Sequence, residues 1–297
     1  LKSDEPNKKL NLLFINKTSA LVINNIVMLV ACLTILLGTI YPIIIEVITN
    51  KRISVGAPYF NSTALPILLP GFLLMSVAPA LSWQTNKFPK FKNYLFIFIF
   101  LSIATFIITF FTTFSTWGFV GILLSLFIIT ASLFSLYNNF RKYGFKNIFL
   151  LNNSLIAHIG VGITILGITC SSVFQSEYKY SFLINDINKV KNFTLELKDV
   201  RIFQKSNFQE LEASFLLSKN NKIVTTINPS KRYYHVSKMI TTEAGIYRNW
   251  FQDFYIVLGS EKNGKWDVRI FLNPLVNFIW LGVILMIFSG LLGTRKK

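Results

Sequence analysis

Residues 155–170 read LIAHIGVGITILGITC, an apolar run with no Asp, Glu, Lys or Arg and a single histidine, His158. Extended to residues 152–174, the stretch is long enough for a helix to cross the hydrocarbon core of a bilayer, which takes roughly 20 residues. We therefore predict a membrane-spanning helix here, with a histidine held inside it.

Five other apolar runs have a similar length, and 52% of the 297 residues are hydrophobic. The six predicted spans cover residues 21–45, 64–83, 93–112, 118–137, 152–174 and 274–293. The second contains Pro66, Pro70 and Pro79, so we expect it to be kinked or broken and to pack inside the bundle, where neighbouring groups satisfy the freed carbonyls. The chain is predicted to be a polytopic membrane protein.

Basic residues in the short loops set the expected orientation. The net charge is +17, and the loops predicted to share one side carry Lys2, Lys8, Lys9, Lys17, Lys87, Lys90, Lys92, Arg141, Lys142, Lys146, Arg295, Lys296 and Lys297. The short loops opposite carry Lys51 and Arg52. The positive-inside rule then places both termini in the cytoplasm, or in the matrix of a mitochondrion, and explains the charge without nucleic acid.

Residues 175–272 change from long apolar runs to alternation. Phe193, Leu195 and Leu197 alternate with polar residues, and the same period recurs at Leu211, Ala213, Phe215, Leu217, at Ile223, Thr225, Ile227, and at Trp266, Val268, Ile270, Leu272. Alternation of this kind is typical of antiparallel strands with one covered face.

The predicted fold is a membrane all-α region of about six helices, with an antiparallel β-rich external domain inserted between the fifth and sixth. The expected domains are residues 1–174, five spans with a cytoplasmic N-terminus, residues 175–272, the external β domain, and residues 273–297, the last span.

His158 is the strongest candidate for chemistry, because an ionisable side chain inside a bilayer is costly unless it is bonded or ligated. Gly160, Gly162 and Gly167 follow it, and small residues let a second helix or a flat macrocycle approach closely. Two interpretations stay open: an axial ligand of a haem that lies against this helix, or a histidine that donates a hydrogen bond between packed helices.

The remaining candidates are weaker. The other histidine, His235, lies in the predicted external domain, about 30 Å across the bilayer from His158, so the two cannot share one iron. A second axial ligand would come from upstream sequence or from Met28. The cluster Lys231, Arg232, Tyr233, Tyr234 and His235 could bind haem propionates or an acidic partner surface, or be a solvated basic strand edge. Glu243 lacks a partner group for acid–base work. Cys32 and Cys170 are expected to be buried, inert thiols within spans.

The chain resembles the C-terminal half of the CcmF/CycK/NrfE family of cytochrome c-type biogenesis proteins. The resemblance rests on the segments LVINN, LLGTIYP, ISVGAPYFN, IAHIGVGITILGI, KRYY, TTEAGI, FQDFYIVLG and NPLVNFIWLGVILMIFSGLL, in this order from residue 21 to residue 292.

The resemblance implies a haem lyase component of cytochrome c maturation, which receives haem from the chaperone CcmE and supports its covalent attachment to CxxCH motifs of apocytochrome c. It also implies a transmembrane haem b with two histidine ligands, one of which matches His158, and partners that include the upstream half of CcmF and CcmH. No catalytic residue of this chain is implied. The family's tryptophan-rich WWD segment is absent, because the five tryptophans are scattered at positions 83, 117, 250, 266 and 280.

Without that segment, enzymatic activity of this chain is uncertain. The alternative is a non-enzymatic scaffold or haem-handling subunit that docks CcmE, CcmH or apocytochrome. The expected location is the bacterial inner membrane, with a periplasmic β domain, although a mitochondrial inner membrane is also compatible. Because the chain starts at Leu1 without an initiator Met or a signal sequence, we expect a fragment or a split-gene product.

Overall fold

The structure, a computed structural model, describes residues 16–51, 53–83, 90–112, 115–144, 152–220 and 222–294. Its helices are α1 (Lys17–Thr49), α2 (Ala57–Val77), the short 3₁₀ helix η1 (Ala78–Ala80), α3 (Phe91–Phe111), α4 (Thr116–Tyr143), α6 (Asn153–Val173) and α7 (Val276–Thr294). Its strands are β1 (Ser176–Phe182), β2 (Ile187–Val190), β3 (Phe193–Gln204), β4 (Phe208–Lys219), β5 (Lys222–Ile227), β6 (Ser230–Tyr234), β7 (Met239–Glu243), β8 (Gly245–Arg248), β9 (Gln252–Lys262) and β10 (Lys265–Pro274).

Six of the described helices are long and apolar enough to cross a membrane, which confirms the predicted number of spans. All ten described strands follow α6 and precede α7. The predicted fold class, a helical membrane region with a β domain inserted before the last helix, is therefore correct.

The described residues form two compact units: one within residues 1–114, 119–164 and 281–297, and one within residues 115–118 and 165–280. The division falls inside α6 and α7, so each of these helices begins in one unit and ends in the other. The predicted domain boundaries at 174/175 and 272/273 remain a prediction.

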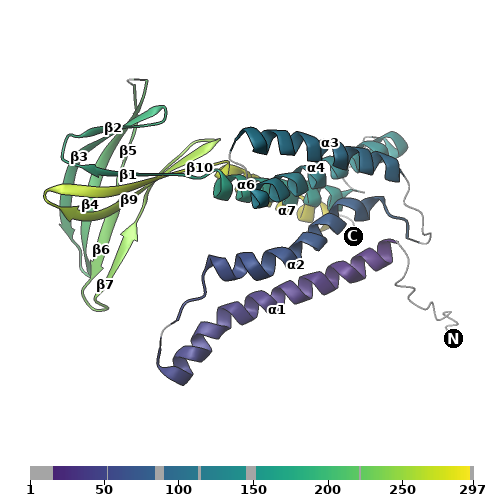
Figure 1. Cartoon of the computed structure of the whole chain (residues 1–297), viewed down its shortest axis with the longest axis horizontal. Helices are drawn as coiled ribbons and strands as arrows, with labels where there is room; N and C mark the ends of the chain where they lie inside the picture. The colour runs from purple at the N-terminus through teal and green to yellow at the C-terminus, as the bar shows by residue number, and fades with distance from the viewer. Residues whose placement is uncertain are drawn as a thin grey trace. The chain divides into compact units, whose positions relative to one another are not determined.

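In the first unit, α1 and α2 run side by side in opposite directions (Figure 1). Asn16 starts α1 by accepting a hydrogen bond from the backbone N–H of Ser19 at 2.8 Å, as an N-cap does. Further along, Gly38 faces the ring of Tyr59 from the start of α2, and the Tyr59 hydroxyl donates to the carbonyl of Thr34 at 3.3 Å. The missing side chain at Gly38 lets the two helices approach.

The proline-bearing span changes helix type at one of its three prolines, as expected, but it is less buried than expected. Pro66 and Pro70 lie within a continuous α2, and the chain changes to the 3₁₀ geometry of η1 only at Ala78, just before Pro79. The most buried span among the described helices is α4: in its most apolar 18-residue stretch 44% of the residues are buried, against 17% in the span that contains α2. Ile128 and Ala131 of α4 are fully buried, so α4 is the central helix of this part of the chain.

The second unit contains two antiparallel sheets (Figure 1). One has the order β1-β10-β9-β8; the other has the order β2-β3-β4-β6-β7, with β5 also paired to β4. Both sheets contribute to one hydrophobic core, where Phe182 meets Phe215 with ring centroids 5.4 Å apart and Phe193 meets Phe254 at 4.8 Å. This is a two-layer arrangement, as the alternating pattern predicts.

Candidate functional site

His158 lies in the second turn of α6, and its ring is mostly enclosed by protein. The Nδ1 atom is buried and has no hydrogen-bond partner in the part of the chain that the structure describes. A buried polar nitrogen without a partner costs free energy, on the order of 1–3 kcal/mol in proteins. The hydrogen-bonding role that was one interpretation of His158 is therefore not seen among the described residues.

The glycines of α6 contact neighbouring helices. A Cβ at Gly160 would lie 2.7 Å from the carbonyl oxygen of Gly282, and one at Gly167 would lie 2.7 Å from the backbone nitrogen of Ile279, both in α7. At 100° per residue, these two glycines lie on the side of α6 opposite His158. Of the two partners expected for these small residues, a second helix or a flat macrocycle, the second helix is the one seen at Gly160 and Gly167, because α7 occupies that face.

Gly162 is nearer to the face that carries His158, but it too is covered. A Cβ there would lie 2.6 Å from Cγ1 of Ile129 and 3.1 Å from the carbonyl oxygen of Ser125, both in α4. The small residues of α6 thus pack helix against helix on two sides. Any ligand of His158 must lie on the remaining side.

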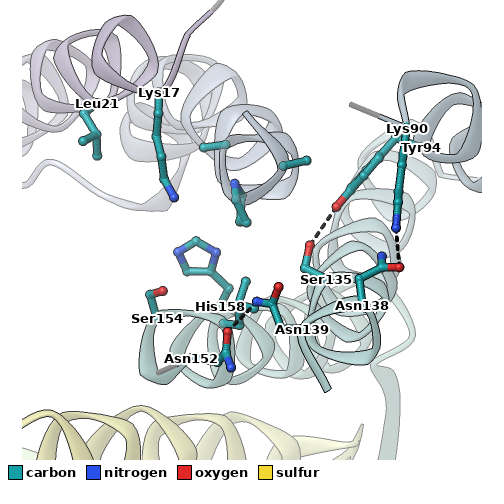
Figure 2. A pocket seen from close by; sticks show the side chains of 14 residues that line it. Lys17, Leu21, Lys90, Tyr94, Ser135, Asn138, Asn139, Asn152, Ser154 and His158 are labelled. Atoms are coloured by element: carbon teal, nitrogen blue, oxygen red, sulfur yellow. Dashed lines mark hydrogen bonds between the residues drawn. The ribbon is translucent and has the colours of Figure 1, made fainter. Parts of the chain in front are cut away.

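That side opens into a cavity of about 480 Å³ (Figure 2). Its lining comes from α1, η1, α4, α6 and the start of α3 and comprises Lys17, Leu21, Ala78, Pro79, Ala80, Lys90, Tyr94, Ser135, Asn138, Asn139, Asn152, Ser154, Leu155 and His158. The volume lies within the range of small-molecule and cofactor sites, roughly 300–1,000 Å³.

Two cations line the cavity, and no carboxylate is present among its described lining residues. Figure 2 shows the amino group of Lys17 pointing toward the imidazole of His158. The same amino group lies 5.0 Å from the ring centroid of Trp83. Lys90 donates a hydrogen bond to Oδ1 of Asn138 and lies 5.6 Å from the ring centroid of Phe134. The cavity therefore attracts a negatively charged group.

Neutral polar side chains complete the wall. Asn139 donates to Oδ1 of Asn152, and the hydroxyls of Tyr94 and Ser135 lie 2.7 Å apart in a buried hydrogen bond. Lys17 begins α1, Lys90 immediately precedes α3, and Asn152 immediately precedes α6. These helix ends meet at one end of the unit, as expected if the basic loops all lie on the same side of the membrane. That this side is the cytoplasm or the mitochondrial matrix stays a prediction.

Several basic residues of that prediction lie outside the described residues: Lys2, Lys8, Lys9, Arg52, Lys87, Lys146, Arg295, Lys296 and Lys297.

The cavity residues fit the predicted haem. An imidazole is available as an axial ligand, and the cations Lys17 and Lys90 are suited to carboxylates such as haem propionates. In the described part of the chain, no three His, Cys, Asp or Glu side chains gather as a metal site. A metal that enters within a macrocycle needs only axial ligands from protein, so a single histidine on this side is sufficient.

The other candidates for ligation do not join this cavity. Met28 lies against α2, where its Cε would be 3.7 Å from a Cβ at Gly71, and it is not a cavity residue. Both cysteines are free thiols; Cys170 is buried as expected, whereas Cys32 is exposed, contrary to the expectation that both are buried. His235 follows β6 in the β unit, where its Nε2 lies 3.2 Å from Nε2 of Gln204.

The basic cluster of the β domain is not a strand edge. β6 pairs with β4 on one side and β7 on the other, so Arg232 lies inside the sheet. Its Nε is 2.8 Å from Oε1 of Glu210, its Nη1 is 3.5 Å from Oε1 of Glu243, and its guanidinium stacks 5.0 Å from the centroid of Phe208. Arg232 and Glu243 therefore form a structural ion-pair network.

Electrostatics support that assignment. Burial alone would raise the pKa of Glu210, but hydrogen bonds from Ser230 and Arg232 outweigh it and hold that pKa below its ordinary value. The hydrogen bond to Glu210 raises the pKa of Arg232 in turn. Each group stabilises the charged form of the other.

Comparisons with known proteins agree with the family resemblance. A family model described as "CcmF C-terminal beta-sandwich" matches residues 173–274. The cytochrome c-type biogenesis protein CycK of Bradyrhizobium diazoefficiens is 29% identical over an alignment of 299 residues. The alignment covers 95% of this chain and 45% of CycK. CcmF of Escherichia coli is 28% identical over 281 residues, 93% of this chain and 43% of CcmF.

A solved structure, "Cytochrome c Heme Lyase CcmF", is similar with a TM-score of 0.74 at 19% identity, over 94% of this chain and 46% of that one. At this identity the likeness shows the fold. The chain spans about half the length of the curated relatives that it matches.

Proposed function

We propose, from the premise that this chain is a homologue of the C-terminal half of the CcmF, CycK and NrfE proteins, that it works in cytochrome c maturation as part of a membrane haem lyase. In this proposal His158 is one axial ligand of a haem b, and the second ligand comes from the upstream half of the lyase. The complex receives haem from CcmE and supports its attachment to CxxCH motifs of apocytochrome c.

The observation that carries the proposal is the position of His158. Its Nδ1 is buried without a partner among the described residues, and its ring faces the cavity that also holds Lys17 and Lys90. A histidine that served only to join helices would have a hydrogen-bond partner there. Iron would bind the ring nitrogen that faces the cavity, and the buried Nδ1 would then take its hydrogen-bond partner from outside the described residues.

The chain's own residues take distinct roles. His158 orients the bound group, Lys17 and Lys90 pair with its carboxylates, and the glycine contacts of α6 fix the helix that presents the imidazole. When bound, haem b would supply one-electron redox chemistry, and the attachment of haem to cytochrome requires reduced iron.

A second candidate function is docking without catalysis. The edge strand β7 pairs only with β6 in the described sheet, and Met239 and Ile240 on it are exposed. An unprotected edge of this kind accepts an added strand from a partner, for which CcmE, CcmH and apocytochrome are the candidates. The lack of the WWD segment in the sequence favours this role for the chain taken alone.

The proposed location is the bacterial inner membrane, with the β domain in the periplasm. The six apolar helices and the bacterial relatives support a multi-pass protein of that membrane. The excess of basic residues around Lys17, Lys90 and Arg141 supports an orientation with this end in the cytoplasm.

A maturation assay tests the function. The chain is co-expressed with its upstream half and the other maturation proteins, and covalent haem in a reporter apocytochrome is measured after denaturing electrophoresis. The proposal expects His158→Ala to abolish the haem-stained reporter, and the matched control His235→Ala to leave it unchanged. The docking alternative expects a different result. Under it, His158→Ala gives a normal amount of haem-stained reporter, whereas Ile240→Pro, which blocks strand addition at β7, abolishes the stained reporter.

A further inference from the structure

The β8–β9 turn carries an adjacent pair of exposed aromatic side chains. Trp250 is 76% exposed and Phe251 is 69% exposed, although both belong to a turn between strands of the core sheet. Single exposed apolar residues are ordinary on protein surfaces. An exposed Trp next to an exposed Phe at the tip of one turn is less common. Neither side chain belongs to the described hydrophobic core.

The backbone of this turn is held firmly. Oδ1 of Asn249 accepts hydrogen bonds from the backbone N–H groups of Phe251 at 3.0 Å and Gln252 at 2.8 Å, and the N–H of Asn249 donates to the carbonyl of Gln252 at 3.1 Å. Such an Asx-type turn pre-organises the chain. Trp250 and Phe251 are thus presented outward from a rigid turn.

The same turn is tied to the start of α7, a candidate membrane span. The N–H of Leu275 donates to the carbonyl of Phe251 at 2.8 Å, and Nδ2 of Asn277 donates to the carbonyl of Asn249 at 2.6 Å. Leu275 is the single residue between β10 and α7. The turn therefore lies at the level where the chain passes from the β domain into the apolar helix.

A membrane-spanning α7 would begin at a membrane interface, so the turn would lie at the depth of that interface. Tryptophan is enriched there because its ring is apolar while its N–H reaches water or head groups. Trp280, one turn into α7, is also 61% exposed, so the helix itself presents an aromatic side chain beside the same boundary. We propose that the turn Asn249–Gln252 is a lipid anchor that inserts Trp250 and Phe251 into the membrane interface from which α7 starts.

The anchor would fix the β domain at the membrane surface through a second point besides the covalent connections to α6 and α7. This inference does not depend on haem or on the proposed lyase function, because it needs only a membrane-spanning α7. Its failure would leave the assignment of His158 untouched.

Quenching by brominated lipid tests the anchor. The full chain is reconstituted in phosphatidylcholine–phosphatidylglycerol vesicles, and the fluorescence of Trp250 is obtained as wild type minus Trp250→Phe. The inference expects this component to be lost in vesicles whose acyl chains are brominated near the head group, to be quenched less by bromines near the chain ends, and to be insensitive to aqueous iodide.

Two variants on the same chain calibrate the result. The fluorescence of Trp266 is obtained in the same way, as wild type minus Trp266→Phe. Trp266 lies at the other end of β10, eight residues from Pro274 and so roughly 26 Å along the strand, and its fluorescence should not be quenched by brominated lipid. The fluorescence of Trp280 in α7, obtained as wild type minus Trp280→Phe, should be quenched by brominated lipid. Quenching of Trp250 by iodide alone would show a solvent-facing turn, and protection from both quenchers would show a protein-covered one; either overturns the anchor.

Discussion

Gly160 and Gly282 face each other across the contact between α6 and α7, so closely that a Cβ at position 160 would lie 2.7 Å from the carbonyl oxygen of Gly282. The hydroxyl of Ser289 donates to the carbonyl of Asn153 along the same pair of helices. Glycine is needed on both sides because any side chain would force the backbones apart. The helix that carries His158 is held in place by this contact.

Substituting Gly282 therefore tests the packing. Gly282→Ala places a methyl group against the carbonyl of Gly160 and against Thr164, and overpacking of this kind typically costs about 1–3 kcal/mol. We expect a lower thermal unfolding midpoint in detergent, measured by circular dichroism. Gly290→Ala in the same helix is the matched control, because a Cβ there meets no atom within 4 Å. Equal midpoints for the two variants would contradict the described contact.

Lys17 is expected to bind a carboxylate of the group that His158 ligates. Lys17→Met keeps the apolar stem of the side chain and removes its charge, so haem affinity of the complex with the upstream half should fall about 10- to 100-fold, as for loss of one charge-assisted hydrogen bond. Titration of the apo complex with haem, followed by absorbance, measures this. Lys92→Met, at an exposed position near the start of α3 outside the cavity, should bind as the wild type does.

Haem dimethyl ester separates charge pairing from a general loss of structure. The ester lacks the propionate charges, so it should bind the wild type more weakly than haem does, and Lys17→Met should weaken it no further. An equal loss of affinity for haem and for its ester in Lys17→Met would contradict the pairing while leaving ligation by His158 intact.

The ion pair of Arg232 with Glu210 predicts a pH-dependent stability of the β domain. The pKa of Glu210 is lower in the folded state than its ordinary value, so its contribution is present above that value, about 4.3, and is lost as pH falls through and below it. Arg232→Met leaves Glu210 buried with one partner fewer, and we expect a loss of about 1.5–3 kcal/mol at pH 7.

Chemical unfolding of wild type and Arg232→Met over a range of pH measures this difference, with tryptophan fluorescence as the probe. The gap between the two proteins should narrow from pH 6 toward acidic pH, because protonated Glu210 no longer needs the guanidinium. Arg201→Met is the control, since Arg201 pairs with Asp199 at an exposed site and should change little. A gap that is constant with pH would contradict the ion-pair account.

Periodicity predicted most of the fold. Leu195, Leu197, Phe215 and Leu217 are all fully buried, as their alternation with polar residues requires, because each strand packs one face on a shared core. The pattern failed at Ile223, which is 70% exposed, because among the described strands β5 pairs with β4 alone and lies off the main strand order. Alternation identifies a strand but does not tell how far its partner sheet extends.

The site was only partly predictable. His158 was identified from the cost of an ionisable group in a membrane span, which depends on one residue and its neighbours. Lys17, Lys90 and Asn139 were not identified as its neighbours, since they lie in separate helices and only the tertiary packing brings them to one cavity. The glycines near His158 signalled close packing correctly, but sequence could not tell whether α7 or a macrocycle occupies that face.

Ligation of a haem b by His158 would give the purified complex a b-type absorbance spectrum. The complex of this chain with its upstream half is purified as wild type, His158→Ala and His235→Ala, and a reduced-minus-oxidised difference spectrum is recorded for each. We expect a b-type signal in the wild type and in His235→Ala and its loss in His158→Ala, with the complex still assembled. A b-type signal of wild-type size and position in His158→Ala would show that His158 is not a ligand of the haem.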